Sequence, residues 1–121
     1  MSKQVLVIDD AADILSLFKK LLNDLGIAHV TCTTTGGAAI DLLKTKHFDL
    51  VILDIELPDI DGKKVLDRIN VEKFNVPVVM CSSYNSVDNV QLTWEMGAKG
   101  FLAKPIDPQK LQNLLLRIGI L

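Results

Sequence analysis

The stretch DLVILDIELPDIDG, residues 49–62, decides the fold. It contains an apolar run at residues 50–53 that is closed by turn residues, which is typical of a short strand covered on both faces. Asp54 follows this run directly. An ionised carboxylate in that place lies partly out of water, which is unfavourable unless another group pairs with it. An isolated acid could simply end the strand, so the rest of the chain has to decide between a turn and a site.

Apolar runs alternate with helical patterns five times along the 121 residues. The expected strands cover 4–9, 28–32, 49–54, 76–81 and 100–103. The expected helices cover 14–25, 36–46, 62–70, 86–96 and 107–118, the last with Asp107 as N-cap and Pro108 in its first turn. This alternation predicts one α/β domain, residues 1–121, whose five-stranded parallel sheet has helices on both faces. The common doubly wound, flavodoxin-like (βα)5 order is 2-1-3-4-5.

Composition and charge argue against several classes of protein. A net charge of -2 without any run of Lys or Arg argues against direct nucleic-acid binding. No apolar stretch is long enough for a membrane span or a signal peptide, so we expect a cytoplasmic protein without membrane contact. Cys32 and Cys81 lie in strand-like segments without a CxxC pair, and we expect buried reduced thiols. His29 and His47 show no ligand spacing and are expected to face solvent.

Polar residues gather at the carboxyl ends of the expected strands, where sheets of this order bind ligands. They are Asp9 and Asp10 after the first strand, Asp54 after the third, Ser82 and Ser83 after the fourth, and Lys104 after the fifth. Taken singly, an acid could cap a helix, a serine could begin a turn and a lysine could be solvated. Their convergence on one edge of one sheet favours a shared site.

Carboxylates gathered at this edge would repel one another, by roughly 3 kcal/mol for each pair at ~5 Å in an effective dielectric near 20. A hard divalent cation would relieve this repulsion, and ligands that offer only oxygen suit Mg²⁺. Such a cation bridges to an anionic substrate, which favours phosphoryl transfer with one carboxylate as the nucleophile. Lys104 and the hydroxyl of Ser82 would then hold the remaining phosphoryl oxygens.

The segments VIDD, VILDIELPDIDG, PVVMCSS and GAKGFLAKP together resemble the receiver domain of bacterial two-component response regulators, over essentially the whole chain. The resemblance implies that Asp54 accepts a phosphoryl group from a phosphohistidine donor, in a histidine kinase or a histidine phosphotransferase. Asp9 and Asp10 match the acidic pair that serves Mg²⁺, with Asp54 and the main-chain carbonyl of Glu56 as further ligands. The domain would be no enzyme beyond catalysing its own phosphorylation and dephosphorylation.

The resemblance also assigns residues that respond to the phosphoryl group. Ser82 matches the switch hydroxyl, where threonine is commoner, and Lys104 matches the lysine of the family's site. Phe101 matches the aromatic switch residue, where tyrosine is frequent, so no switch here can use a phenolic hydroxyl. The peptide bond between Lys104 and Pro105 is expected to be cis, an uncommon state even before proline.

The expected helix over 86–96 carries two apolar stripes. Val90 and Trp94 share one face, and Leu92 and Met96 share the nearly opposite one, at about 100° per residue. In the resembled fold Trp94 points outward, so we expect the side of Leu92 to face the sheet. A partly exposed tryptophan with apolar neighbours is typical of a binding hot spot. We expect the fourth helix, fifth strand and last helix to form an output surface for a protein partner or a homodimer, through Val90, Trp94, Phe101 and Leu116.

Two other classes of protein use similar residues. A haloacid-dehalogenase-like phosphohydrolase also uses an aspartate at a strand end, Mg²⁺, a hydroxyl and a lysine. That family carries Asp-x-Asp on its first strand, whereas the candidate nucleophile Asp54 is on the third; steady turnover of a phosphate ester would favour the enzyme. A flavodoxin-like module shares the strand order, but Asp9 and Asp10 would repel the phosphate of FMN.

Overall fold

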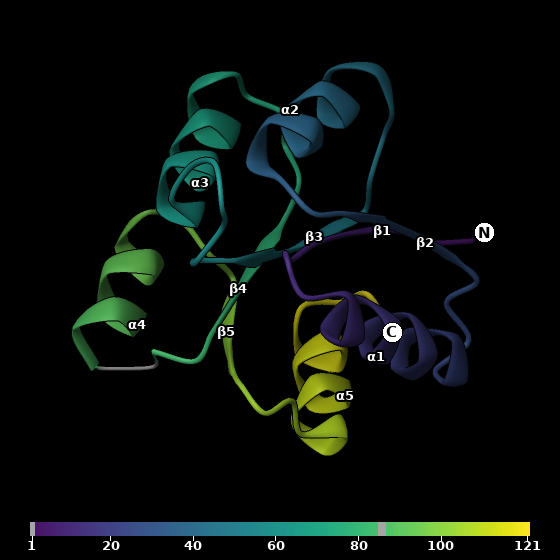
Figure 1. Ribbon diagram of the computed structural model, residues 1–121. Coiled ribbons are helices and arrows are strands. Elements are labelled where there is room, and N and C mark those ends of the chain that lie inside the picture. The colour runs from purple at the N-terminus through teal and green to yellow at the C-terminus, as the bar shows by residue number, and fades with distance from the viewer. Residues whose placement is uncertain (1, 85–86) are drawn as a thin grey trace.

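The computed structural model describes residues 2–84 and 87–121. Its centre is a parallel sheet in the order β2-β1-β3-β4-β5 (Figure 1). The strands are β1 (Gln4–Ile8), β2 (His29–Thr33), β3 (Leu50–Asp54), β4 (Val78–Ser82) and β5 (Gly100–Ala103). Helices α1 (Ala12–Asp24) and α5 (Pro108–Arg117) cover one face, and α2 (Gly36–Thr45), α3 (Gly62–Val71) and α4 (Val87–Glu95) cover the other (Figure 1). The predicted doubly wound fold and its strand order are confirmed.

Two apolar cores lie on opposite sides of the sheet, because successive side chains of a strand point to opposite faces. In β1, Val5 and Val7 pack in the core beneath α1 and α5, whereas Leu6 and Ile8 pack in the core beneath α2 and α3. The central strand β3 is buried over its whole length, including Asp54. The carboxylate of Asp54 therefore lies at the end of a buried strand whose side chains pack into both cores.

The observed helices and strands differ from the predicted ones by no more than two residues at either end. Asp107 is the N-cap of α5 and accepts the N–H of Gln109 at 2.9 Å, with Pro108 in the first turn. Both features were predicted. Of the helix expected over 86–96, Ser86 lies outside the described residues and α4 runs over Val87–Glu95. None of the helices in the described ranges is long and apolar enough to cross a membrane.

The prediction of two buried thiols is wrong for one of them. Cys81 is buried in β4, but Cys32 is exposed on β2, and both cysteines are free. The reason is topological, since β2 is an edge strand in which no residue is fully buried. His29 and His47 are exposed as predicted.

The prediction that Leu92 faces the sheet is also wrong. Leu92 is 42% exposed, and over residues 88–95 of α4, where burial is described, the buried residue is Thr93. Its hydroxyl donates to the carbonyl oxygens of Asn89 at 3.1 Å and Val90 at 3.0 Å, so a buried polar group is satisfied within its own helix. Trp94 is 47% exposed and points outward as predicted.

The loop between β3 and α3 is fixed by two of its acids. Asp59 accepts the N–H groups of Gly36 at 2.9 Å and Gly37 at 3.0 Å, at the start of α2. These two hydrogen bonds hold the pKa of Asp59 below its usual value. Asp61 is the N-cap of α3 and accepts the N–H of Lys63 at 2.8 Å. Two acids of the deciding stretch therefore shape the loop. A third, Asp49, accepts the N–H of Gln4 at 2.7 Å, which leaves Asp54 and Glu56 for the site.

Gly62 lets helix α3 begin against the end of β3. Its N–H donates to the carbonyl oxygen of Ile55 at 2.7 Å. A Cβ atom at this position would collide with the carbonyl oxygen of Asp54 and lie 2.7 Å from the Cα atom of Ile55. Both neighbours are backbone atoms of a buried segment and cannot rotate away, so the site edge and α3 meet this closely only with glycine.

We expect Gly62→Ala to lower the free energy of unfolding by about 2–3 kcal/mol, because overpacking here moves backbone and not a flexible side chain. Urea denaturation followed by circular dichroism measures the change. Gly37→Ala is the matched control, since its Cβ would meet only Asp59 Oδ2 at 3.5 Å, an ordinary contact. Equal stabilities for the two variants would contradict the close approach.

Candidate functional site

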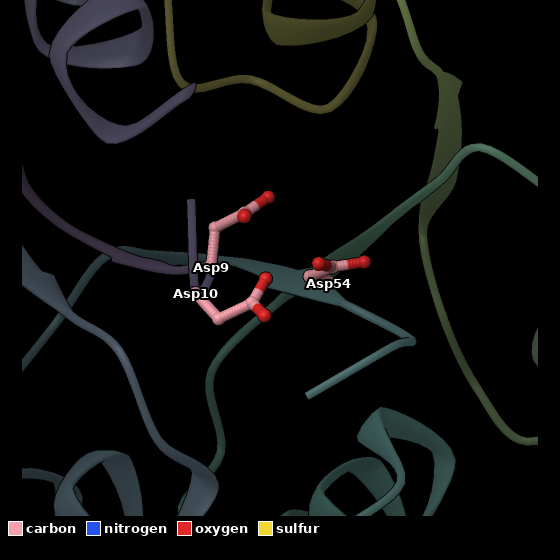
Figure 2. Close-up of side chains that lie close together, drawn as sticks. All are labelled: Asp9, Asp10 and Asp54. Carbon is pink, nitrogen blue, oxygen red and sulfur yellow. The ribbon is translucent and has the colours of Figure 1, made fainter. Parts of the chain in front are cut away.

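Asp9, Asp10 and Asp54 lie together at the carboxyl edge of the sheet (Figure 2). The strands that carry them are neighbours, and Ile8 of β1 pairs with Leu53 of β3. Each acid offers an oxygen within 4.8 Å of the oxygens of the other two. Asp9 and Asp54 are buried and Asp10 is exposed. Helix α1 has Ala11 and not Asp10 as its N-cap, so the carboxylate of Asp10 is not engaged as a helix cap.

The strand pairing brings Ser82 and Lys104 to the same edge. Asp54 pairs with Cys81 of β4, and the N–H of Ile55 donates to the carbonyl oxygen of Cys81 at 3.0 Å. On the other side of β4, the N–H of Lys104 donates to the carbonyl oxygen of Ser82 at 3.0 Å. These hydrogen bonds continue the sheet to its last residues, so the positions of the site residues follow from the backbone.

Lys104 places one ammonium between two buried carboxylates. Its Nζ atom lies 2.7 Å from Asp9 Oδ2 and 3.2 Å from Asp54 Oδ2. Asp9 Oδ1 accepts the N–H of Ala11 at 2.9 Å. Asp9 Oδ2 is buried, and despite its close ion pair it receives no directed hydrogen bond from any described residue. Asp10 adds a third carboxyl group nearby, so the site holds three acids and one ammonium.

The pKa of Asp54 is raised to about 6, mainly by burial and also by the charge of Asp9. Lys104 and the N–H of Glu56, which donates to Asp54 Oδ1 at 3.1 Å, lower it without outweighing these effects. For Lys104, burial lowers the pKa, but the contacts with Asp9 and Asp54 outweigh it and the pKa is raised. Lys104 therefore stays charged near pH 7, and ionisation of Asp54 is the unfavourable step.

The side chain of Glu56 has a contact that the sequence did not indicate. The hydroxyl of Ser82 lies 2.8 Å from both carboxylate oxygens of Glu56 and donates to that carboxylate. The same hydroxyl oxygen accepts the N–H of Tyr84 at 2.8 Å. Glu56 and Ser82 are 26 residues apart, so only the pairing of β3 with β4 could have suggested that they meet.

The residues of the expected output surface lie on α4, β5 and α5. Val90 and Phe101 are half-buried and line a groove of about 480 Å³, together with Arg117. The guanidinium of Arg117 lies 6.0 Å from the centre of the Trp94 ring, a cation–π arrangement. Leu116 is exposed on α5 but is not among the residues that line the groove.

The peptide bond between Lys104 and Pro105 is cis, as predicted. It stands directly after β5, where Lys104 turns its side chain toward the two acids. Fold and site together define a doubly wound α/β domain with an acidic centre that one lysine compensates.

Comparison with known proteins identifies the family. Residues 5–116 match the response regulator receiver domain family, and the chain belongs to it. Sporulation initiation phosphotransferase F of Bacillus subtilis is 30% identical over 113 residues, which cover 93% of this chain and 90% of that protein. The crystal structure of a signal receiver domain from Vibrio parahaemolyticus superposes with a TM-score of 0.90 at 30% identity, covering 99% of this chain and 95% of that one.

A longer relative shows the same domain as part of a larger protein. Regulatory protein LuxO of Vibrio vulnificus is 32% identical over 106 residues, which cover 88% of this chain but 23% of LuxO. The chain thus spans less than a quarter of that relative's length. Membership of the receiver family places the chain among signalling domains of two-component systems, and not among phosphohydrolases or FMN-binding proteins.

We expect Asp54→Asn to stabilise the protein near pH 7, because it removes a charge that the folded protein disfavours. The folded-state pKa of about 6 lies above the ordinary value of 3.8, so the folded protein binds more protons and loses stability as the pH rises from about 4 to about 6. The free energy of unfolding should rise by about 1–2 kcal/mol near pH 7, less than the full pKa difference implies because Lys104 loses one partner. The gain should vanish toward about pH 4.

Urea denaturation at a series of pH values without metal ions measures this difference. Asp61→Asn is the matched control, since it replaces an exposed acid in the same region with another good helix cap. A stabilisation by Asp54→Asn that does not change with pH would contradict the raised pKa of Asp54.

Proposed function

We propose that Asp54 is the phosphoacceptor of this receiver domain. The observation that carries the proposal is the burial of Asp54 at the carboxyl edge of the sheet, with Lys104 and the N–H of Glu56 on its two oxygens. A carboxylate oxygen of Asp54 attacks the phosphorus of a phosphohistidine in a histidine kinase or a histidine phosphotransferase. The P–N bond breaks, its electron pair leaves with the imidazole, and an acyl phosphate forms on Asp54.

The residues around Asp54 suit the charge that moves in this reaction. Phosphoryl transfer gains mostly from positioning and from neutralising charge on the phosphoryl oxygens. Lys104 keeps its ammonium charged in place, since its pKa is raised. Ser82 brings a buried hydroxyl to the same edge, through the hydrogen bond from the backbone of Lys104. Both side chains can donate to phosphoryl oxygens, which is the role we propose for them.

The acids of the site fit a Mg²⁺ ion. Asp9, Asp10 and Asp54 offer hard oxygen ligands within 4.8 Å of one another, and the buried Asp9 Oδ2 lacks a directed hydrogen bond among the described residues. We propose these three carboxylates and the carbonyl oxygen of Glu56 as ligands. When bound, Mg²⁺ neutralises charge on the carboxylates and on the phosphoryl group. With that charge balanced, the carboxylate of Asp54 could approach the donor's phosphoryl group with less repulsion.

We also propose that the domain transmits its signal through contacts with another protein. Val90, Trp94, Phe101 and Leu116 would meet a protein partner or a second copy of the chain. The exposed Trp94 and Leu116, and the groove that Val90 and Phe101 line, support this proposal. The net charge of -2 gives no reason to invoke nucleic acid as the direct partner. The cytoplasm is the location that the receiver family's pairing with histidine kinases favours.

Incubation with a small phosphodonor such as acetyl phosphate and Mg²⁺ should add one phosphoryl group per chain. The reason is that Lys104 and the hydroxyl of Ser82 lie around a single acceptor, Asp54. Intact mass spectrometry measures the gain, and chelation of Mg²⁺ should prevent it. Asp54→Asn should abolish labelling, whereas Asp61→Asn should be labelled like the parent. Labelling of Asp54→Asn at the parent's rate would refute the acceptor, and continuous release of phosphate from a phosphate ester would favour the phosphohydrolase.

Trp94, the chain's only tryptophan, reports on the proposed output surface. Iodide should quench its fluorescence in the free protein, because 47% of the residue is exposed. If phosphorylation promotes self-association through this surface, phosphodonor and Mg²⁺ should reduce the quenching, and Leu116→Asp should remove that reduction. Val71→Asp is the matched control, because Val71 is an aliphatic residue on α3 that is 67% exposed, compared with 54% for Leu116. Two outcomes would contradict the assignment. One is that Leu116→Asp and Val71→Asp remove the reduction in quenching equally, and the other is that phosphorylation leaves the quenching of Trp94 unchanged even when a partner is present.

A further inference from the structure

The hydroxyl of Ser82 has one proton, and Glu56 accepts it in this structure. A serine hydroxyl can donate one hydrogen bond and accept two. The oxygen of Ser82 accepts the N–H of Tyr84 at 2.8 Å, and its proton points to the Glu56 carboxylate, 2.8 Å away. Ser82 is completely buried, so no water can take the place of an acceptor without a rearrangement. Its donor capacity is therefore fully used before any phosphoryl group arrives.

A phosphoryl group on Asp54 would need the same proton. Glu56 is tied to Asp54 through its backbone N–H, which donates to Asp54 Oδ1 at 3.1 Å, so only its side chain is able to turn away. Glu56 is partly exposed, and a carboxylate that leaves Ser82 can be solvated. Ser82 has no such alternative, because a buried hydroxyl needs an acceptor inside the protein. The two anions, the Glu56 carboxylate and the phosphoryl group, are thus competitors for one donor.

We propose that Glu56 is a positioning residue that holds the hydroxyl of Ser82 away from the phosphoryl group until phosphorylation displaces it. The proposal rests on Asp54 being the phosphoacceptor. It describes two states, one with the proton of Ser82 on Glu56 and one with it on the phosphoryl group, and phosphorylation shifts the balance between them. The strength of the hydrogen bond between Ser82 and Glu56 therefore determines how strongly the phosphoryl group must attract the hydroxyl of Ser82 before the hydroxyl changes its acceptor.

The displaced hydroxyl is connected to helix α4. When Ser82 changes its acceptor, its contact with the N–H of Tyr84 has to adjust. The carbonyl oxygen of Tyr84 accepts the side-chain amide of Asn89, within the first turns of α4. Two hydrogen bonds, one from the N–H of Tyr84 to Ser82 and one from Asn89 to the carbonyl oxygen of Tyr84, thus connect the change of acceptor at Ser82 to the helix that carries Trp94.

A double-mutant cycle between Glu56 and Ser82 tests the competition. The probe is beryllofluoride with Mg²⁺, an analogue of the phosphoryl group, and its dissociation constant is measured by ¹⁹F NMR. Glu56→Ala should tighten binding by about tenfold in the protein with Ser82, the effect of releasing one hydrogen bond to a charged group. In the Ser82→Ala protein, the same change should have a much smaller effect. Equal factors in the two backgrounds would overturn the proposal, since they would mean that Glu56 acts by its charge alone.

Two conservative variants separate hydrogen bonding from charge. Glu56→Gln keeps the length of the side chain and an oxygen acceptor but makes a weaker, neutral hydrogen bond, so its affinity for beryllofluoride should lie between those of the parent and Glu56→Ala. Glu56→Asp keeps the charge but is one methylene shorter and loses its reach to Ser82, so it should bind more tightly. The opposite order, with Glu56→Gln tight and Glu56→Asp like the parent, would overturn the proposal.

The same measurements distinguish a failure of this proposal from a failure of the proposed function. If Asp54 is not the acceptor, beryllofluoride will bind the Asp54→Asn variant as well as it binds the parent, or it will bind neither. If Asp54 is the acceptor but Glu56 does not hold Ser82, the parent will bind it and the cycle will be additive. Circular dichroism of each variant checks that the fold is retained.

Discussion

The ammonium of Lys104 between two buried carboxylates is the interaction on which the site depends. Asp9 directly follows β1 and Asp54 ends β3, and both are buried. Two such charges would repel each other strongly, and Lys104 offsets that repulsion from 2.7 and 3.2 Å. The compensation is incomplete, since Asp10 adds a third acid and the pKa of Asp54 stays raised. The remaining negative charge makes the edge suited to a divalent cation.

Hydrogen bonds along the strand ends connect the parts of this site. Ile55 donates to Cys81, and Lys104 donates to Ser82, so the acid-bearing β3, the hydroxyl-bearing β4 and the lysine after β5 form one continuous backbone unit. A phosphoryl group at Asp54 would act on neighbours that are already in place. Glu56 is partly exposed, and its carboxylate pairs with the buried hydroxyl of Ser82.

Four of the five acids in the deciding stretch 49–62 have distinct roles in the loop and the site. Asp59 and Asp61 fix the starts of α2 and α3, and their capping bonds shape the loop. Asp54 is held in the sheet, and Glu56 combines a backbone bond to Asp54 with a side-chain bond to Ser82. In a region with this many carboxylates, the hydrogen-bond donors that each one finds decide whether it shapes the fold or serves the site. Gly62 then allows α3 to close over the end of β3.

The sequence by itself determined the strands, the helices and the acids at the sheet edge, because apolar periodicity and turn residues are local signals. Alternation of strand and helix predicted a parallel sheet, and the commonest doubly wound order then predicted the meeting of Asp9, Asp10, Asp54 and Lys104. Only the tertiary structure decided which face α4 buries, since Thr93 satisfies its hydroxyl within the helix and leaves Leu92 exposed. It also decided the exposure of Cys32 on the edge strand and the contact of Glu56 with Ser82. These depend on how neighbouring elements cover one another and on which donor each side chain reaches, and neither is written in a local pattern.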